Sequence, residues 1–179
     1  IERIDGGAYT IPTDAPESDG TLQWHSTTIV IVEAHGGGEI GLGYSYADTA
    51  TARLVQELLA GVVSGRRCMD VAGCWDAMVA AIRNLGRPGI ASMAIAAVDN
   101  ALWDLKCKIL DQPLATLLGA VRDLVPVYGS GGFTSYDDRR LSEQLGGWVR
   151  GGITRVRLKL GRDGRADLGR WVRARAAIG

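Results

Sequence analysis

Alternating and continuous apolar positions predict β-structure in the first third of the chain. Residues 1–11 are expected to form a strand, and residues 26–35 (STTIVIVEAH) are β-branched and apolar, as is typical of another. Three glycines at 36–38 can make a turn before residues 39–46 (EIGLGYSY) return as a third strand. The polar, proline-containing segment 12–24 is expected to be a loop. The pattern therefore predicts an antiparallel meander.

The middle third changes to a helical pattern, with apolar residues recurring three and four positions apart. Asp48 or Thr49 can cap a helix that ends near Val63, and Asp70 can cap a second helix that ends near Ile82. A third, alanine-rich helix is predicted over residues 90–109. A short helix is expected to follow, from Pro113 to about Gly119. The meander and these helices together predict an α+β unit.

The last third reads as strand, helix, strand and helix. The expected elements are a strand over 124–130, a helix over 137–149, a strand over 154–161 and a helix from 165 to the end. This order is typical of a parallel sheet. We therefore divide the chain into an α+β unit, residues 1–123, and the start of an α/β unit, residues 124–179. Two βα units leave an open edge, so the strands either join the first sheet or begin a larger (β/α)-barrel.

Composition excludes several classes of function. Twenty basic residues balance twenty acidic ones, so nucleic acid is not an expected partner. No run of residues is apolar enough to cross a membrane, and no membrane partner is expected. The 25 glycines are scattered and indicate many turns. Cys68, Cys74 and Cys107 show no disulfide or zinc spacing, which favours buried thiols and a cytoplasmic location.

The most informative polar pattern lies in the segment 156–160, where charged and apolar residues alternate. Arg157 and Lys159 share one face of this predicted strand. In a half-exposed strand, that face is simply exposed to solvent. In a barrel it enters the lumen, where the charge of Arg157 favours the neutral amine of Lys159. A neutral amine can act as a general base, while Arg157 can hold a carboxylate.

Other candidate residues give weaker signals. His25 and His35 flank one predicted strand and are too far apart to bind one metal ion. His25 either contacts a ligand or is an ordinary surface residue. Ser130 lies in a glycine-rich segment, 129–132, that either lines a site or makes a plain turn. The sequence contains no phosphate-binding loop, no H-E-x-x-H zinc motif and no nucleophile elbow.

Four segments resemble the mandelate racemase and muconate lactonizing enzyme branch of the enolase superfamily. The most specific is the helical run AIAAVDNALWDLKCK over residues 94–108, followed by PLATLLGA over 113–120. Residues 125–132 (VPVYGSGG) and 155–161 (RVRLKLG) are similar to the first two barrel strands. The resemblance implies an α+β capping domain followed by the first two βα units of a TIM-type barrel, truncated at residue 179.

The resemblance also implies a mechanism and its residues. Enzymes of this branch bind a substrate carboxylate through Mg²⁺ and remove the proton from the adjacent carbon. Lys159 matches the second lysine of the K-x-K motif, the base, and Arg157 replaces the first. The loop 12–25 and the run Tyr44-Ser45-Tyr46 resemble segments that close over the substrate. The expected substrate-binding residues are His25, Tyr44, Tyr46 and Ser130.

The Mg²⁺ ligands are expected downstream of Gly179, so no acidic residue here is assigned to the metal. Asp99 and Asp104 of the helical signature are instead expected to make structural contacts.

We therefore expect the parent protein to be a racemase, epimerase or acid-sugar dehydratase acting on a small carboxylate, with cycloisomerisation less favoured. The chain by itself is expected to be inactive. A homo-oligomer is implied by the resemblance alone. The alternative is a non-catalytic α+β binding or interaction module.

Overall fold

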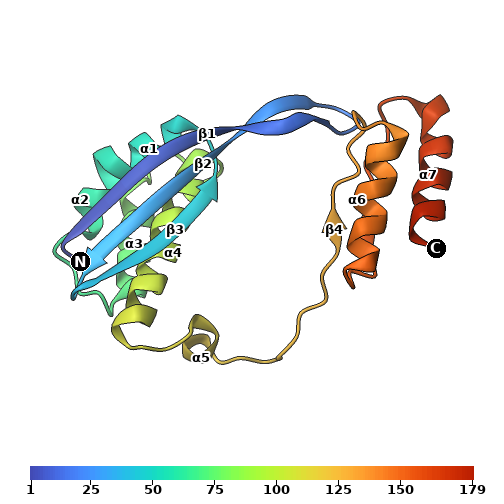
Figure 1. Ribbon diagram of the computed structural model, residues 1–179. Coiled ribbons are helices and arrows are strands. Elements are labelled where there is room, and N and C mark those ends of the chain that lie inside the picture. Colours follow the sequence, from blue (N-terminus) through green and yellow to red (C-terminus); the bar gives the residue numbers. More distant parts are fainter. The chain divides into compact units, whose positions relative to one another are not determined.

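The computed structural model describes all residues from 1 to 179, and contacts divide them into two compact units (Figure 1). The first unit consists of residues 1–11 and 27–121. The second consists of residues 12–26 and 122–179. The segment 12–26 is thus separated in sequence from the rest of its unit. The boundary after Val121 lies close to the predicted one, but the assignment of 1–123 and 124–179 to separate domains remains a prediction.

The first unit contains a three-stranded antiparallel sheet in the order β1-β2-β3. Its strands are β1 (Arg3–Ser18), β2 (Gln23–Gly36) and β3 (Glu39–Tyr46). Residues of β2 and β3 pair from Ile29 opposite Tyr46 to Gly36 opposite Glu39. The glycine turn at 37 and 38 has positive φ angles, which explains why glycine is required there. The predicted meander is confirmed.

The loop predicted over residues 12–24 is wrong, because β1 continues to Ser18 and β2 begins at Gln23. Burial alternates along 12–16, with Thr13 and Ala15 more buried than their neighbours, and Ser18 at the end of the strand is fully buried. The inward positions are small or polar, so the segment lacks the apolar alternation by which strands are recognised. Hydrogen bonds to residues more than 100 positions away, described below, support this part of the hairpin.

The helices of the first unit largely follow the prediction. One helical run comprises α1 (Thr49–Leu54), a π-helical turn η1 (Val55–Leu59) and α2 (Ala60–Val63). It is followed by α3 (Val71–Ala81), α4 (Ile90–Ile109) and α5 (Leu114–Leu118). The Asp48 side chain accepts a hydrogen bond from the Ala50 amide, and Asp70 accepts one from Gly73. Both predicted aspartate caps are therefore present.

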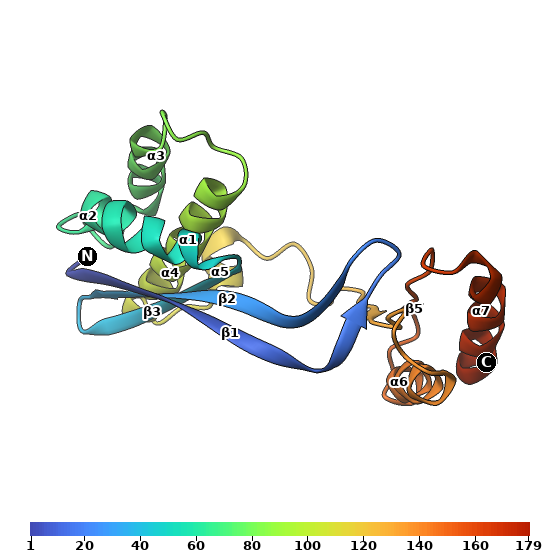
Figure 2. The same ribbon diagram turned by 90° about the horizontal axis from the view of Figure 1, so that it is seen from above.

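The core of the first unit lies between the sheet and helices on one of its faces (Figure 2). Helix α4 runs along β3, and small residues allow their backbones to approach closely. A side chain on Gly41 would overlap the carbonyl oxygen of Ala101, and one on Gly43 would overlap that of Ala97. The alanines of the signature helix and the glycines of β3 are therefore complementary. All three cysteines are free; Cys74 and Cys107 are buried and Cys68 is half-buried.

The second unit contains two short parallel strands and two helices. The strands are β4 (Gly129–Ser130) and β5 (Val156–Arg157), and the helices are α6 (Asp138–Arg150) and α7 (Gly164–Ile178). Leu141, Leu145 and Ala174 form its buried centre. The strands are shorter than predicted, and Leu124 and Val125 are exposed. The two strands pair over two residues each, so the regular ladder is short.

No helix of the structure is both long enough and apolar enough to span a bilayer.

Candidate functional site

The candidate site lies at the carboxyl ends of β4 and β5. Ser130 is the pairing partner of Arg157, and the Lys159 amide donates a hydrogen bond to the Gly132 carbonyl at 3.1 Å. The ladder thus places Ser130, Arg157 and Lys159 at neighbouring strand ends. In α/β structures, residues at this end of a parallel sheet line ligand sites.

The predicted alternation holds over residues 156–158 but not at Leu160, which is 39% exposed. Val156 and Leu158 pack against the core formed by α6 and α7. Arg157 alternates with them, is exposed, and therefore belongs to the opposite face of the sheet. Lys159 follows the strand and is half-buried, and its position on the same face as Arg157 remains a prediction.

The tip of the β1–β2 hairpin is fastened to the loop that follows β4. The Thr134 amide donates to the Ser18 carbonyl at 2.8 Å, and the Ser18 and Thr134 hydroxyls lie 2.6 Å apart. Thr134 Oγ1 also donates to the Asp19 carbonyl at 3.0 Å. Further out, Arg140 and Asp14 form an ion pair at 2.8 Å. Backbone and side-chain contacts therefore both hold the hairpin at this end of the strands.

Asp19 organises the turn at the hairpin tip, next to Lys159. Its Oδ1 accepts hydrogen bonds from the amides of Leu22 and Thr21 and from the Thr21 hydroxyl. The amides of Leu22 and Thr21, then the Thr21 hydroxyl, lower the pKa of Asp19, and the positive charge of Lys159 lowers it further. A side chain on Gly20 would lie 2.7 Å from the Leu160 carbonyl. The tip therefore packs directly against the end of the β5 segment.

Aromatic contacts join the hairpin to the loop after β4. Trp24 meets Phe133 edge-on with ring centroids 5.5 Å apart, and Phe133 meets Tyr136 at 5.4 Å. The indole nitrogen of Trp24 donates to Glu17 at 2.8 Å. From α7, Arg170 donates to the carbonyls of Phe133 and Tyr136 at 2.7 and 2.9 Å. Arg170 therefore supports the loop to which the hairpin is bound.

The structure brings together only part of the predicted site. Ser130, Arg157 and Lys159 are neighbours, and His25 belongs to the same unit as an exposed residue of β2. Tyr44 and Tyr46 belong to the first unit. They lie on β3 in a T-shaped pair, with centroids 6.4 Å apart, and both are exposed. Substrate contacts by His25, Ser130 and the two tyrosines remain predictions.

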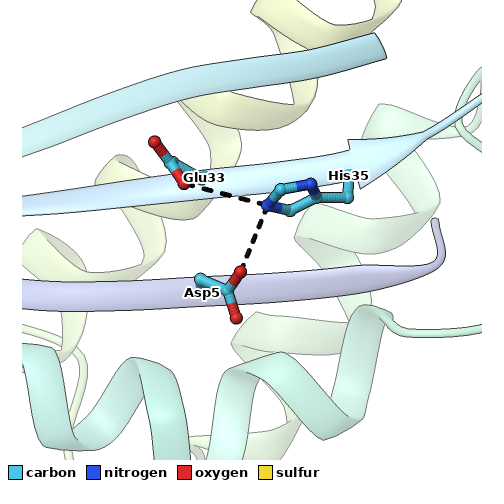
Figure 3. A group of neighbouring side chains, drawn as sticks. All are labelled: Asp5, Glu33 and His35. Atoms are coloured by element: carbon cyan, nitrogen blue, oxygen red, sulfur yellow. Dashed lines mark ion pairs between the residues drawn. The ribbon is translucent and has the colours of Figure 1, made fainter. Parts of the chain in front are cut away.

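One group of possible metal ligands lies on the sheet of the first unit (Figure 3). His35 Nε2 is 3.1 Å from Asp5 Oδ2 and 3.8 Å from Glu33 Oε2. The guanidinium of Arg3 already lies among them, with Nε 2.8 Å from Asp5 and Nη2 3.2 Å from His35. Arg3 thus supplies the positive charge that balances these carboxylates.

The second unit contains no comparable group of ligands. Mg²⁺ requires near-octahedral oxygen coordination, so the residues of this chain do not fit the Mg²⁺ site that the resemblance implies.

The acidic residues of the signature helix make contacts within the first unit. Asp104 accepts a hydrogen bond from the Leu42 amide at 2.7 Å and pairs with Lys108 at 2.8 Å. Lys108 in turn donates to the Ile40 carbonyl at 2.7 Å. The predicted structural role of Asp104 is confirmed. Asp99 is half-buried beside Trp75 and Arg87, and burial raises its pKa.

Sequence reasoning missed Asp19, Thr134 and Arg170. The run Asp19-Gly20-Thr21 is a turn signal that would have located the hairpin tip within the polar segment. No local signal predicts the contacts of Thr134 and Arg170, because their partners are distant in sequence.

Comparison with known families supports the resemblance. Residues 11–119 match the family model of the mandelate racemase / muconate lactonizing enzyme N-terminal domain. A crystal structure of a mandelate racemase/muconate lactonizing enzyme-like protein from Rubrobacter xylanophilus is 57% identical, with a TM-score of 0.98. It covers all of this chain, which corresponds to 50% of that protein.

Two curated relatives also match the whole chain. The 3,6-anhydro-alpha-L-galactonate cycloisomerase of Streptomyces coelicolor is 32% identical, and the chain covers 52% of it. The L-talarate/galactarate dehydratase of Salmonella typhimurium is 33% identical, and the chain covers 48% of it. A crystal structure of the Salmonella enzyme with Mg and L-lyxarohydroxamate has a TM-score of 0.87 over the whole chain at 29% identity, with 49% of that chain covered. The chain thus spans about half the length of these relatives.

Proposed function

This chain belongs to the mandelate racemase and muconate lactonizing enzyme family, and we propose that it forms the amino-terminal half of an enzyme that removes the α-proton of an acid sugar. The observation that carries the proposal is the position of Lys159. It follows β5 at the carboxyl end of the parallel pair and next to the hairpin tip, and the face proposed for it is the one away from α6 and α7. Related enzymes act on acid sugars.

Lys159 acts as the base in this proposal. Its neutral Nζ accepts the proton from the carbon adjacent to the substrate carboxylate, and the C–H electron pair passes into the carboxylate to give an enediolate. In a dehydratase, the β-hydroxyl then leaves as water after protonation. In a racemase or epimerase, a proton returns to the same carbon from the other side. The acid for either step lies outside this chain.

Arg157 and the hairpin assist the base. Arg157 precedes Lys159 by two residues, and its fixed charge favours a bound carboxylate. The hairpin tip excludes water from the strand ends, and His25, Ser130, Tyr44 and Tyr46 are the proposed substrate contacts. Mg²⁺, when bound, would stabilise the enediolate charge. The structure of the Salmonella relative contains Mg, and we propose that the ligands are supplied by residues beyond this chain.

Dehydration is the reaction we favour, because both the L-rhamnonate dehydratase of Saccharopolyspora erythraea and the Salmonella dehydratase match the chain. Cycloisomerisation is the second candidate, because the Streptomyces cycloisomerase also matches the whole chain, at 32% identity. The two outcomes share the proton abstraction assigned to Lys159 and differ in what happens to the enediolate.

The test uses the full-length protein in D₂O with Mg²⁺, offered galactarate, L-talarate, L-rhamnonate and 3,6-anhydro-L-galactonate. NMR follows deuterium at the α-carbon and the formation of product. We expect at least one of these acids to turn over. Lys159→Ala should lower α-proton exchange by about 10²–10⁴-fold, the usual contribution of a general base. Exchange that persists undiminished in this variant would remove Lys159 from the role of base.

Arg155→Ala is the matched control. Arg155 precedes β5 by one residue and has the same strand parity as Lys159, but it lies at the amino end of the strand. Its loss should leave turnover within a few-fold of the unchanged enzyme. The 179-residue chain by itself should show no Mg²⁺-dependent turnover, because it contains the base without a metal site.

A further inference from the structure

Two neighbouring strands of the first unit present charged and titratable side chains on the surface of the sheet (Figure 3). Ile4 of β1 and Ala34 of β2 are buried in the core of this unit. Because side chains alternate along a strand, the residues on either side of these two lie on the opposite face. These residues are Arg3, Asp5, Glu33 and His35. A histidine and two carboxylates from separate strands therefore share one surface.

The spacing of the potential ligand atoms suits a single metal ion. His35 Nε2 is 3.1 Å from Asp5 Oδ2 and 3.8 Å from Glu33 Oε2, and the three ligand atoms all lie within 4.8 Å of one another. Zinc bonds of about 2.0–2.2 Å place neighbouring ligands of a tetrahedral site about 3.3–3.6 Å apart. Small rotations about the side-chain bonds would therefore bring the three atoms onto one ion.

The surroundings of the His35 imidazole also favour a cation. Its Nε2 lies 3.1 Å from Oδ2 of Asp5, an acceptor, and 3.2 Å from Nη2 of Arg3, a donor. With a proton on Nε2, the ring N–H faces the N–H of Arg3. Without this proton, the ring lone pair faces the carboxylate. Neither form satisfies both neighbours, whereas a metal ion would bind the lone pair and the carboxylates together.

Arg3 is the group that a metal ion would have to displace. Its Nε lies 2.8 Å from Asp5 Oδ2, so the guanidinium provides the positive charge among these ligands. The Arg3 side chain is 62% exposed, whereas that of His35 is only 18% exposed. The guanidinium can therefore turn into solvent while the imidazole stays in place. Because exposed ion pairs contribute little, a divalent ion that binds all three ligands can replace it.

The types of ligand decide which metal ion fits. One imidazole nitrogen and two carboxylate oxygens suit Zn²⁺, which in open sites binds three protein ligands and a water molecule. The Asp5 and Glu33 side chains are about half exposed, so solvent can supply the fourth ligand. Mg²⁺ instead requires near-octahedral oxygen coordination, to which an imidazole contributes no oxygen. The group should therefore discriminate against Mg²⁺.

We propose that Asp5, Glu33 and His35 form a Zn²⁺ site, with Arg3 as the competing cation. The ligands come from two strands, so the bound ion joins the beginning of β1 to the end of β2. An ion that binds only the folded chain stabilises it. The proposal does not depend on the reaction proposed for Lys159.

Isothermal titration calorimetry of the 179-residue chain under reducing conditions measures the binding of Zn²⁺. We expect one ion to bind per chain. His35→Ala should raise the dissociation constant at least about 100-fold, because loss of a group that merely supports a metal ligand already costs about 10–100-fold. The matched control is His25→Ala, which removes the other histidine of the chain. The control should bind Zn²⁺ as the unchanged chain does.

Two further variants test the ligand set at exposed positions. Glu33→Gln removes a carboxylate while keeping the size of the side chain, and it should raise the dissociation constant at least about tenfold. Glu39→Gln, at an exposed glutamate of β3, is its control and should have no effect. Arg3→Ala should lower the dissociation constant about two- to fivefold, the range expected for the loss of a competing exposed ion pair.

Thermal melting in the absence of metal shows which variants are folded, and Glu33→Gln keeps the test valid if His35→Ala is not. Zn²⁺ should raise the Tm of the unchanged chain but not that of His35→Ala, and Mg²⁺ should raise neither. A lack of saturable Zn²⁺ binding by the unchanged chain would overturn the proposal. Binding that is equally tight in His35→Ala and Glu33→Gln would overturn it too, because the ion would then lie elsewhere.

Discussion

At the scale of single residues, Asp104 of the family signature stabilises the fold. Its carboxylate binds the Leu42 amide and Lys108, and Lys108 binds the Ile40 carbonyl. Burial disfavours the charged carboxylate, but the hydrogen bonds from Lys108 and Leu42, with the charge of Lys108, outweigh burial and lower the pKa of Asp104. The ionised residue therefore joins α4 to the edge of β3.

This lowered pKa predicts a pH-dependent contribution to stability. The contribution is complete above the pKa of the unfolded chain and is lost as the pH falls through the lower pKa of the folded state, below about pH 4. Asp104→Asn should cost about 0.5–1 kcal/mol at pH 7, a value reduced by solvent exposure, and almost nothing near pH 2. Urea unfolding across this range measures the difference. An equal loss at both pH values would contradict the assignment, and Asp76→Asn on exposed α3 surface is the control.

Gly43 carries a second prediction at this scale. A methyl group there would overlap the carbonyl oxygen of Ala97, which belongs to helix backbone and cannot rotate away. Gly43→Ala should therefore lower the free energy of unfolding by about 2–3 kcal/mol. Gly61→Ala is the control, because its added methyl group would contact nothing. Gly61→Ala should stabilise the helix by up to about 1 kcal/mol. If both variants lost a comparable amount of unfolding free energy, the close approach of the backbones would not be the cause.

At the scale of elements, the long β1–β2 hairpin is the feature that forms the candidate site. Its outer part is polar, and residues 12–26 belong to the second unit by their contacts. Thr134 joins it to the loop after β4 through both backbone and hydroxyl, and Asp19 shapes the turn beside Lys159. The same segment that the family resemblance associates with substrate closure is thus built as a strand pair.

The anchoring of this hairpin can be measured directly. Thr134→Ala removes the hydroxyl contacts to Ser18 and Asp19 but keeps the backbone bond. Amide hydrogen exchange within residues 13–24 should accelerate about tenfold, as expected for the loss of one or two hydrogen bonds from a local opening reaction. Thr154→Ala, at an exposed threonine of the same unit, should leave the exchange of this segment unchanged. Unaltered exchange in Thr134→Ala would show that other contacts hold the hairpin.

At the scale of the whole molecule, the proposed base and the group of possible metal ligands belong to different units. The group of Asp5, Glu33 and His35 lies in the first unit and already contains Arg3. Lys159 lies in the second unit, where no comparable group occurs. The chemistry proposed here therefore depends on residues contributed by the remainder of the protein.

This division predicts that Mg²⁺ does not stabilise the 179-residue chain. A ligand that binds only the folded state raises Tm, and a chain without a ligand set gains nothing. Thermal melts with and without Mg²⁺, matched for ionic strength with NaCl, should give the same Tm. The full-length protein should show a rise in Tm that EDTA reverses. A reproducible rise for the 179-residue chain would reveal a metal site that its acidic groups do not indicate.

The sequence predicts correctly those features that depend on residues close together along the chain. Residues close together in sequence specify the aspartate caps at 48 and 70 and the meander. They also specify the predicted alternation of Arg157 and Lys159 with apolar residues. The sequence pattern predicts a loop where the hairpin lies, because the inward side chains of the hairpin are small or polar. The strands expected over 124–130 and 154–161 are longer than those found, because β4 and β5 pair over only two residues each.

The sequence by itself determined the family, the order of the elements and the face of β5 that carries Arg157. These features can be recognised from short runs of consecutive residues and from apolar positions that repeat with the period of a strand or a helix. Only the tertiary structure decided that the hairpin tip lies beside Lys159 and that β3 turns its large apolar side chains away from α4. Ser18 and Thr134 are 116 positions apart, and no local pattern encodes a hydrogen bond between such distant residues.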